Sequence, residues 1–524
     1  MGVGFQKLKL LYHTVKYLKA KQIFYRLYYT FRNKLFKPVY TRKCTGSNDI
    51  IWTDGILYPN SYLKNGTFSF LNIKHNFNGV IDWNYNQYGK LWTYNLNYFD
   101  FLNQADISKV EGLSLIHNYL EMDSGLIDGK EPYPISLRAI NWIKFLSKNK
   151  INNQDINQTL YNHYQILLHN PEYHLLGNHL LENAFSLLFG AVYFGDKRLG
   201  SKAKTLLKSE LEEQILEDGA HFELSPMYHQ ILLHRLLDCI NLLKNNVTSE
   251  FNTLLLFLEE KAVVMVSWLE QVTFKNGMIP MVNDSAYSIT ASTRELRNYA
   301  EKLGIIPKEM SLSKSGYRKF ITSVYECFMD VGNVGPAYQP GHAHADTFSF
   351  VLHVNEKPII IDPGVSTYGI NKIRERERST AYHNTVTVNG QNSSQVWGGF
   401  RVGKRAEVIL LIDEANHISA RHNGFKNYNH NRSFICKDNE LIIEDVLGNN
   451  TIGVAYFHCH PNCKLSHGSQ SNTILIDGIK LSFTGQQKIT IKDYNFANGM
   501  NNLSVSRKIV VPFLGKLRTH VILK

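Results

Sequence analysis

The sequence predicts an all-helical domain followed by an antiparallel β-sandwich. Apolar residues recur at helical spacing from about residue 100 to 305. After about residue 315 they alternate with polar residues, and turn signals separate the segments. The chain has 524 residues, of which 44% are hydrophobic and 19% charged, as is typical of a folded globular protein with several domains. We therefore divide it into residues 1–43, 44–310 and 311–524.

Residues 1–43 form a basic amphipathic N-terminal arm. They contain eleven Lys or Arg and no Asp or Glu, and subtracting these charges from the total of +12 leaves +1 for the rest of the chain. The nearly neutral body gives no basis for nucleic-acid binding. Lys and Arg interrupt the apolar stretches of the arm, and no small-residue cleavage site follows them. The arm is therefore not expected to be a secretory signal.

Three interpretations of the arm remain open. A basic, aromatic-rich helix suits an anionic membrane surface. The alternatives are a helical arm that packs on its own domain and a transit peptide. We expect a cytoplasmic protein, peripheral at the inner membrane face if the first interpretation holds. Six cysteines are too few for a disulfide framework, and no window approaches 18 uninterrupted apolar residues, so an integral membrane protein is not expected.

The helical half is predicted from seven periodic segments. Short Gly, Pro, Asn and Asp connections separate them, so neighbouring helices should run antiparallel. The segments are 135–149, 157–170, 178–195, 197–216, 226–246, 249–272 and 292–304.

The second half is predicted to be an antiparallel sandwich because many short alternating segments follow one another. They are 347–364, 384–391, 406–412, 440–447, 472–485, 487–494 and 505–514.

The predicted helix at 178–195 begins with candidate site residues. Gly177 breaks the chain and Asn178 is a favourable N-cap, which places His179 and Glu182 on one face of the first turn. Taken alone, this pattern favours the simpler interpretation, in which Asn178 only caps the helix and His179 pairs with Glu182.

A second helix start lies at Ser225 and Pro226, which form a strong N-cap and N1 pair. Tyr228 then falls in the opening turn, where a merely packed tyrosine is the alternative interpretation. One returning helix separates this start from the one at Asn178. Both opening turns should therefore lie at the same end of the helical layer, where two helix N-termini favour an anion.

A third cluster lies in PGHAHADTF at 340–348. If residues 342–346 are extended, His342, His344 and Asp346 share one face, and imidazoles with a carboxylate are zinc ligands. The HxHxDH motif of metallo-hydrolases also resembles this segment, but Thr347 stands where its last histidine would be.

Together these motifs resemble the heparinase II/III-like polysaccharide lyases. The resemblance covers roughly residues 90 to 410, with the motifs in the expected order. The matching segments are YPISLRAINW (133–142), NHLLEN (178–183), ELSPMY (223–228), NDS (283–285), GHAHADTFSF (341–350), DPG (362–364) and YHNT (382–385).

The resemblance implies an incomplete (α/α) toroid followed by an antiparallel β-sandwich, and β-elimination on a uronic-acid-containing glycan. It implies that Tyr228 is the Brønsted acid or base and that His179 and His342 assist the proton transfers. Asn178 would neutralise the substrate carboxylate, and Glu182 would orient His179.

It further implies a structural zinc ion held by His344, Asp362 and His383, and a sugar cleft lined by Arg138 and Asn141. The neutral body favours an acidic glycan without dense sulfation. The basic arm favours a role in surface-polysaccharide metabolism, for example of a capsule or O-antigen. A non-catalytic glycan-binding or assembly protein on this fold is the alternative, and a metal-dependent hydrolase is a weaker one.

Overall fold

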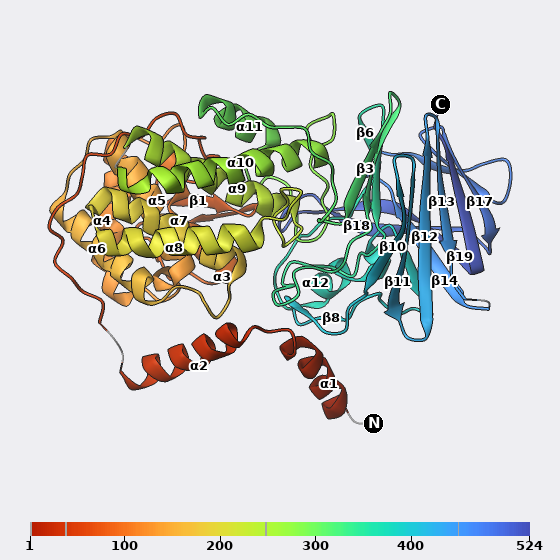
Figure 1. Cartoon of the computed structure of the whole chain (residues 1–524), viewed down its shortest axis with the longest axis horizontal. Coiled ribbons are helices and arrows are strands. Elements are labelled where there is room, and N and C mark those ends of the chain that lie inside the picture. The colour runs from red at the N-terminus through yellow and green to blue at the C-terminus, as the bar shows by residue number, and fades with distance from the viewer. Residues whose placement is uncertain (1–2, 37–38, 247–248, 449, 524) are drawn as a thin grey trace.

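The computed structural model describes residues 3–36, 39–246, 249–448 and 450–523. A helical body and a β-rich body lie side by side, and two N-terminal helices run along one edge of the molecule below both of them (Figure 1). The helices are α1 (Val3–Val15) and α2 (Ala20–Leu35). No helix in the described ranges has the length and apolar character needed to cross a membrane.

The helical body is an incomplete toroid built around helix α7. Nearly every side chain of α7 is buried. α7 packs against α5, α8 and α9. The helices are α3 (Lys90–Tyr98), α4 (Lys109–Met122), α5 (Pro132–Lys148), α6 (Gln154–His169), α7 (Gly177–Phe194), α8 (Lys197–Gln214), α9 (Pro226–Asn245), α10 (Asn252–Val272) and α11 (Thr293–Lys302), with short 3₁₀ turns at Asp100–Asn103, Asp123–Gly125, Asp128–Lys130 and Ser249–Phe251.

All seven predicted helices are present, within a few residues of the predicted ends. The sequence analysis did not predict the small hairpin of β1 (Thr67–Phe70) and β2 (Ile73–Asn76), which belongs to the helical body. Its Phe68 is fully buried among aromatic rings that include Trp83. The hairpin therefore contributes to the toroid core and not to the sandwich.

The β-rich body contains a sheet of eleven strands and one of four. The smaller sheet has the order β3-β4-β5-β6, and the larger has the path β10-β11-β12-β13-β19-β17-β16-β15 with β7, β14 and β18 attached to it. The strands are β3 (Tyr317–Ile321), β4 (Tyr325–Asp330), β5 (Phe350–Val354), β6 (Lys357–Ile360), β7 (Val386–Val388), β8 (Val396–Trp397), β9 (Arg401–Val402), β10 (Val408–Glu414), β11 (His417–Phe425), β12 (Tyr428–Lys437), β13 (Glu440–Val446), β14 (Ile452–His458), β15 (Leu465–His467), β16 (Thr473–Ile476), β17 (Ile479–Gln486), β18 (Thr490–Ala497) and β19 (Leu503–Ile522).

Strand β19 organises the larger sheet because it pairs with four strands. Its first half pairs with β14 and β18, and its second half with β13 and β17, always antiparallel. Alternate apolar side chains of both sheets form one buried core, in which Phe350 packs against Phe434 and Phe457. The predicted order of a toroid followed by an antiparallel sandwich is thus confirmed.

The two bodies meet through loops. Helix α11 ends at Lys302 and β3 begins at Tyr317, while the long connection between β4 and β5 returns to the toroid. Residues 342–346 lie in that connection and form no strand, contrary to the extended segment considered from the sequence. The same body also carries helix α12 (Lys372–Glu377) and a 3₁₀ turn at Thr380–Tyr382.

Candidate active site

The start of α7 places Asn178 at the junction of the two bodies. The helix begins at Gly177 with Leu176 as N-cap, so the prediction that Asn178 caps this helix is wrong. Its side chain instead donates from Nδ2 to Glu223 Oε2 at 2.9 Å, and its backbone N–H donates to Oε1 at 3.0 Å. Gly177 has φ +57°, and a Cβ there would lie 2.6 Å from Glu223 Oε1. Only glycine lets the carboxylate approach this closely.

The start of α9 holds Tyr228 as predicted. Ser225 is the N-cap and its Oγ accepts from the Tyr228 backbone N–H at 3.3 Å, with Pro226 at the first helical position. The Tyr228 phenol donates to the Tyr368 hydroxyl at 3.4 Å. Burial raises the pKa of Tyr228 well above its ordinary value, so the free site keeps the phenol protonated.

His342 joins these two helix starts. Its ring centroid lies 3.9 Å from that of Tyr228, and its Nε2 lies 3.4 Å from Asn178 Nδ2. Its Nδ1 lies 2.8 Å from Asp284 Oδ2. Because an ionised carboxylate only accepts, His342 donates its Nδ1–H to Asp284. Its Nε2 also lies 3.5 Å from Glu223 Oε2. Three distant stretches of chain therefore meet at one place.

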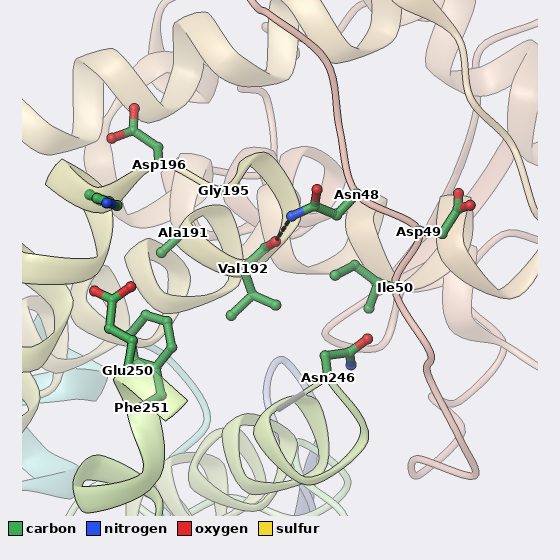
Figure 2. A pocket seen from close by; sticks show the side chains of 11 residues that line it. Asn48, Asp49, Ile50, Ala191, Val192, Gly195, Asp196, Asn246, Glu250 and Phe251 are labelled. Carbon is green, nitrogen blue, oxygen red and sulfur yellow. Dashed lines mark hydrogen bonds between the residues drawn. The ribbon is translucent and has the colours of Figure 1, made fainter. Parts of the chain in front are cut away.

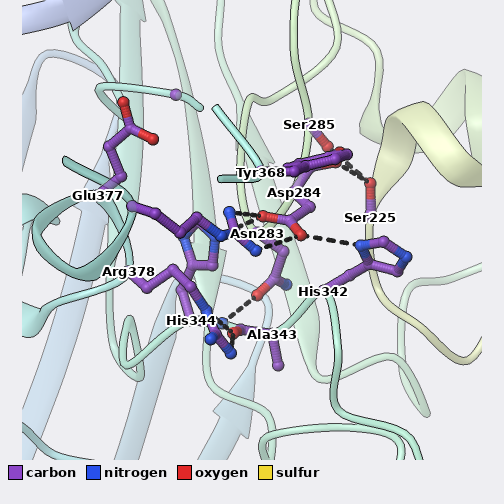
Figure 3. A network of polar contacts seen from close by, with 12 residues as sticks. Ser225, Asn283, Asp284, Ser285, His342, Ala343, His344, Tyr368, Glu377 and Arg378 are labelled. Atoms are coloured by element: carbon purple, nitrogen blue, oxygen red, sulfur yellow. Dashed lines mark hydrogen bonds and ion pairs between the residues drawn. The ribbon is translucent and has the colours of Figure 1, made fainter. Parts of the chain in front are cut away.

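Asp284 is the centre of the buried network beneath His342 (Figure 3). Its Oδ1 lies 2.9 Å from His344 Nε2, and both of its oxygens accept from the fully buried Arg374 guanidinium. Burial alone would raise the pKa of Asp284, but the guanidinium and the two imidazoles hold it well below its usual range. The carboxylate is thus ionised and fixes His342 in one orientation.

His179 is oriented by Glu172 and not by the predicted Glu182. Its Nδ1 lies 3.0 Å from Glu172 Oε1, and its ring packs 4.5 Å from that of Tyr133. Burial alone would lower the pKa of His179, but the Glu172 carboxylate raises it. The side chain is 29% exposed. Like Tyr228 and His342, His179 is partly exposed.

Glu182 points into the toroid core. It is fully buried, and its nearest charged group is Arg235, whose Nε lies 3.5 Å away. Neither carboxylate oxygen has a hydrogen-bond partner among the described residues, and burial raises the pKa of Glu182 to about 7. The sequence spacing of i, i+3 put Glu182 on the face of His179, but tertiary packing supplied a closer carboxylate from the preceding loop.

Arg138 and Asn141 do not line a cleft, contrary to prediction. Both are fully buried in α5. Arg138 donates to the Asn97 carbonyl at 3.1 Å, and Asn141 donates to the Tyr98 carbonyl at 2.9 Å. They fix the end of α3 against α5 because the α5 face that carries them is turned toward the protein interior.

The predicted zinc ligands lie together in the sandwich. His383 Nδ1 lies 2.8 Å from Asp362 Oδ2, and the rings of His344 and His383 are 5.1 Å apart. His344 Nδ1 and His383 Nε2 are buried with no hydrogen-bond partner in the described part of the chain. Their chemistry fits zinc. In the described part of the chain, however, no three or more His, Cys, Asp or Glu side chains lie close enough together to hold a metal ion.

A pocket of about 400 Å³ lies elsewhere, near the far end of α7 (Figure 2). Its wall includes Val192, Asp196 and Phe251. At 1.5 Å per residue, Val192 lies about 21 Å along the helix from Asn178. This pocket therefore contains none of the candidate catalytic side chains.

Four supporting residues were missed as site residues. Glu223 and Asp284 lie inside motifs that the sequence made visible, ELSPMY and NDS, so a signal for them existed. Glu172 and Arg374 had none, because only the fold brings them to His179 and Asp284.

The chain matches two family descriptions over adjoining regions. Residues 134–313 match "Heparinase II/III N-terminus", and residues 307–520 match "Heparinase II/III-like, C-terminal". The two regions together include all the residues of the candidate site.

Known relatives share limited sequence with this chain. A heparin-sulfate lyase of Bacteroides stercoris is 24% identical over 61% of this chain and 52% of its own length. One of Pedobacter heparinus is 26% identical over 52% of this chain and 45% of its own. This chain thus spans about half the length of these relatives. The crystal structure of a heparinase III aligns with a TM-score of 0.62 and 16% identity, covering 86% of this chain and 80% of that one.

Proposed function

The chain belongs to the heparinase II/III-like family, and from this premise we propose that it is a polysaccharide lyase that cleaves a uronic-acid-containing glycan by β-elimination. The names of its relatives, heparin-sulfate lyases, support an acidic polysaccharide as the substrate.

One observation carries the proposal: an amide, a phenol and an oriented imidazole from three distant segments contact one another at two helix N-termini. Asn178, His342 and Tyr228 form a continuous set of contacts, and the latter two are partly exposed. Buried Glu223 and Asp284 accept hydrogen bonds beneath them, so the exposed groups are held in place. A pre-organised set of this kind suits charge that develops during a reaction.

The residues fit the steps of an elimination. A base removes the proton at C5 of the uronate, the electron pair forms the C4–C5 double bond, and the C4–O bond breaks as the leaving oxygen gains a proton. Asn178 and the helix N-termini would stabilise the enolate-like charge on the carboxylate. We assign removal of the C5 proton to His342 Nε2, which lies between the two helix N-termini, and the protonated phenol of Tyr228 suits donation to the leaving oxygen. His179 assists.

A glycan without dense sulfation is the proposed substrate because the body carries a net charge of about +1 outside the arm. Turnover in surface-polysaccharide metabolism, such as that of a capsule or O-antigen, fits this preference.

We also propose that a structural zinc ion is held by His344, Asp362 and His383. The buried imidazole nitrogens without hydrogen-bond partners support this site, and the three side chains would have to move closer together to bind the ion. When bound, it would cross-link the loop before β5 to the segments that follow β6 and α12. A chelator should lower the melting temperature of the protein as isolated, and added zinc should restore it. Loss of turnover on chelation with an unchanged melting temperature would contradict a structural role and favour a metal-dependent hydrolase.

The deciding experiment is a product assay against a panel of uronate glycans. Elimination yields an unsaturated sugar that absorbs ultraviolet light at a wavelength where the substrate does not, and the fragment that carries the new double bond is lighter by one water than its hydrolysis counterpart. Glycan binding without a new double bond would refute the lyase proposal and favour the non-catalytic glycan-binding or assembly protein.

A further inference from the structure

We infer that the outer faces of α1 and α2 form a docking surface for an anionic lipid bilayer. On α2 the side chains of Phe24, Leu27, Phe31 and Leu35 are between 58% and 66% exposed. Their spacing of three and four residues places them on one stripe of the helix.

Helix α1 repeats this pattern. Leu8, Leu11, Tyr12 and Val15 follow the same spacing and are 41–67% exposed. Both helices lie along the same edge of the molecule (Figure 1). Large apolar side chains at helical spacing are normally buried, so two such exposed stripes indicate an interaction surface.

The opposite faces of the helices are already used by the protein itself. The arm contacts both the toroid and the sandwich, through hydrogen bonds from Gln22 to the Leu175 carbonyl, from Tyr29 to the Pro171 carbonyl and from Trp397 to Thr14 Oγ1. Lys19 pairs with Glu213 and lies 4.1 Å from the ring centroid of Tyr338. The expected packing of the arm on its own body is therefore present, yet it leaves the stripes exposed.

Charge identifies the partner. Eleven Lys or Arg and no acidic residue occur in residues 1–43. Exposed basic side chains, including Lys9, Lys16, Arg26 and Lys34, lie between the apolar ones along both helices. Apolar side chains that enter the acyl boundary, flanked by cations that meet phosphate groups, are typical of a helix lying in the plane of an anionic membrane.

Docking would hold the enzyme in one orientation, because the arm is fixed to both bodies. Tyr338, which Lys19 contacts, lies four residues before His342 in the same loop. The elbow between α1 and α2 is therefore next to the loop that carries a candidate catalytic residue. Such a surface fits a peripheral position at a leaflet rich in anionic lipids, such as the cytoplasmic one.

The test is co-sedimentation of the full chain with lipid vesicles. The protein should bind vesicles containing phosphatidylglycerol and not vesicles of phosphatidylcholine alone, and rising salt should weaken binding. The double variant Leu27→Glu/Phe31→Glu should lower the partition coefficient by roughly 100-fold, since two apolar side chains are lost and two negative charges are added.

The matched control is Val110→Glu/Leu256→Glu, which adds the same charge at helical positions of the toroid that are 77% and 62% exposed. It should bind vesicles like the unmodified protein. Equal vesicle binding by both double variants, or no binding of the unmodified protein to anionic vesicles, would overturn the inference. So would a dimer in solution that Leu27→Glu/Phe31→Glu dissociates, because a second copy would then cover the stripe. Vesicle binding requires no lyase activity, so a failed product assay leaves this inference standing.

Discussion

Replacing Tyr228 with Phe should separate the chemistry of the site from its structure. Among the described residues the phenol has one hydrogen-bond partner, Tyr368, at a long 3.4 Å, and the substitution keeps the ring contact with His342. The free energy of unfolding should therefore fall by no more than about 1 kcal/mol. A proton donor in the transition state contributes about 10²–10⁴-fold, so kcat/KM should fall by that factor.

The assay is the rate of unsaturated-product formation, with thermal unfolding measured in parallel. Tyr368→Phe is the matched control, because it removes the same hydrogen bond and leaves the Tyr228 phenol in place. It should keep activity within about ten-fold of the unmodified protein. Near-normal product formation by Tyr228→Phe in a folded protein would refute the assignment of the phenol to proton transfer.

Four further predictions concern Glu172, Asp284 and Arg138. Glu172→Gln removes the carboxylate that raises the pKa of His179, so the limb of the pH–rate profile that reports His179 should move to lower pH; an unmoved limb contradicts the pairing. The His179–Glu172 pair raises the pKa of the histidine and lowers that of the carboxyl group. Its contribution to the free energy of unfolding should therefore be present above the pKa of the carboxyl group in the unfolded chain, and it should fade as the pH rises through the pKa of His179 in the folded protein. Denaturant titrations at several pH values would show this. Asp284→Asn leaves the buried Arg374 uncompensated and should lower the free energy of unfolding by about 3–5 kcal/mol, measured by denaturant titration; a change below about 1 kcal/mol would rule out the central role of this carboxylate. Arg138→Met should leave KM unchanged, because the Arg138 side chain does not reach the surface. A raised KM in a folded variant would instead show that Arg138 contributes to substrate binding.

Helix caps and the spacing of apolar residues predicted the architecture well, because each of these signals depends only on residues that are close together in the sequence. The Ser225–Pro226 pair predicted the start of α9, and the cap bond to the Tyr228 backbone N–H is present. The change of apolar period between about residues 305 and 315 predicted the order of the two bodies, since a helix and a strand bury different spacings. The resemblance of the motifs then predicted which helix starts and loop would carry the site.

Only the tertiary structure decided which charged groups support the site. Glu182 and Arg138 matched by spacing or motif, yet both are buried in the toroid core. Glu172 and Arg374 had no local signal, yet they hold His179 and Asp284. The period of a helix determines which residues share a face. The partner of a buried charged side chain is instead the oppositely charged group that folding brings within hydrogen-bonding distance. That group can come from a segment far away in the sequence, so local sequence patterns do not identify it.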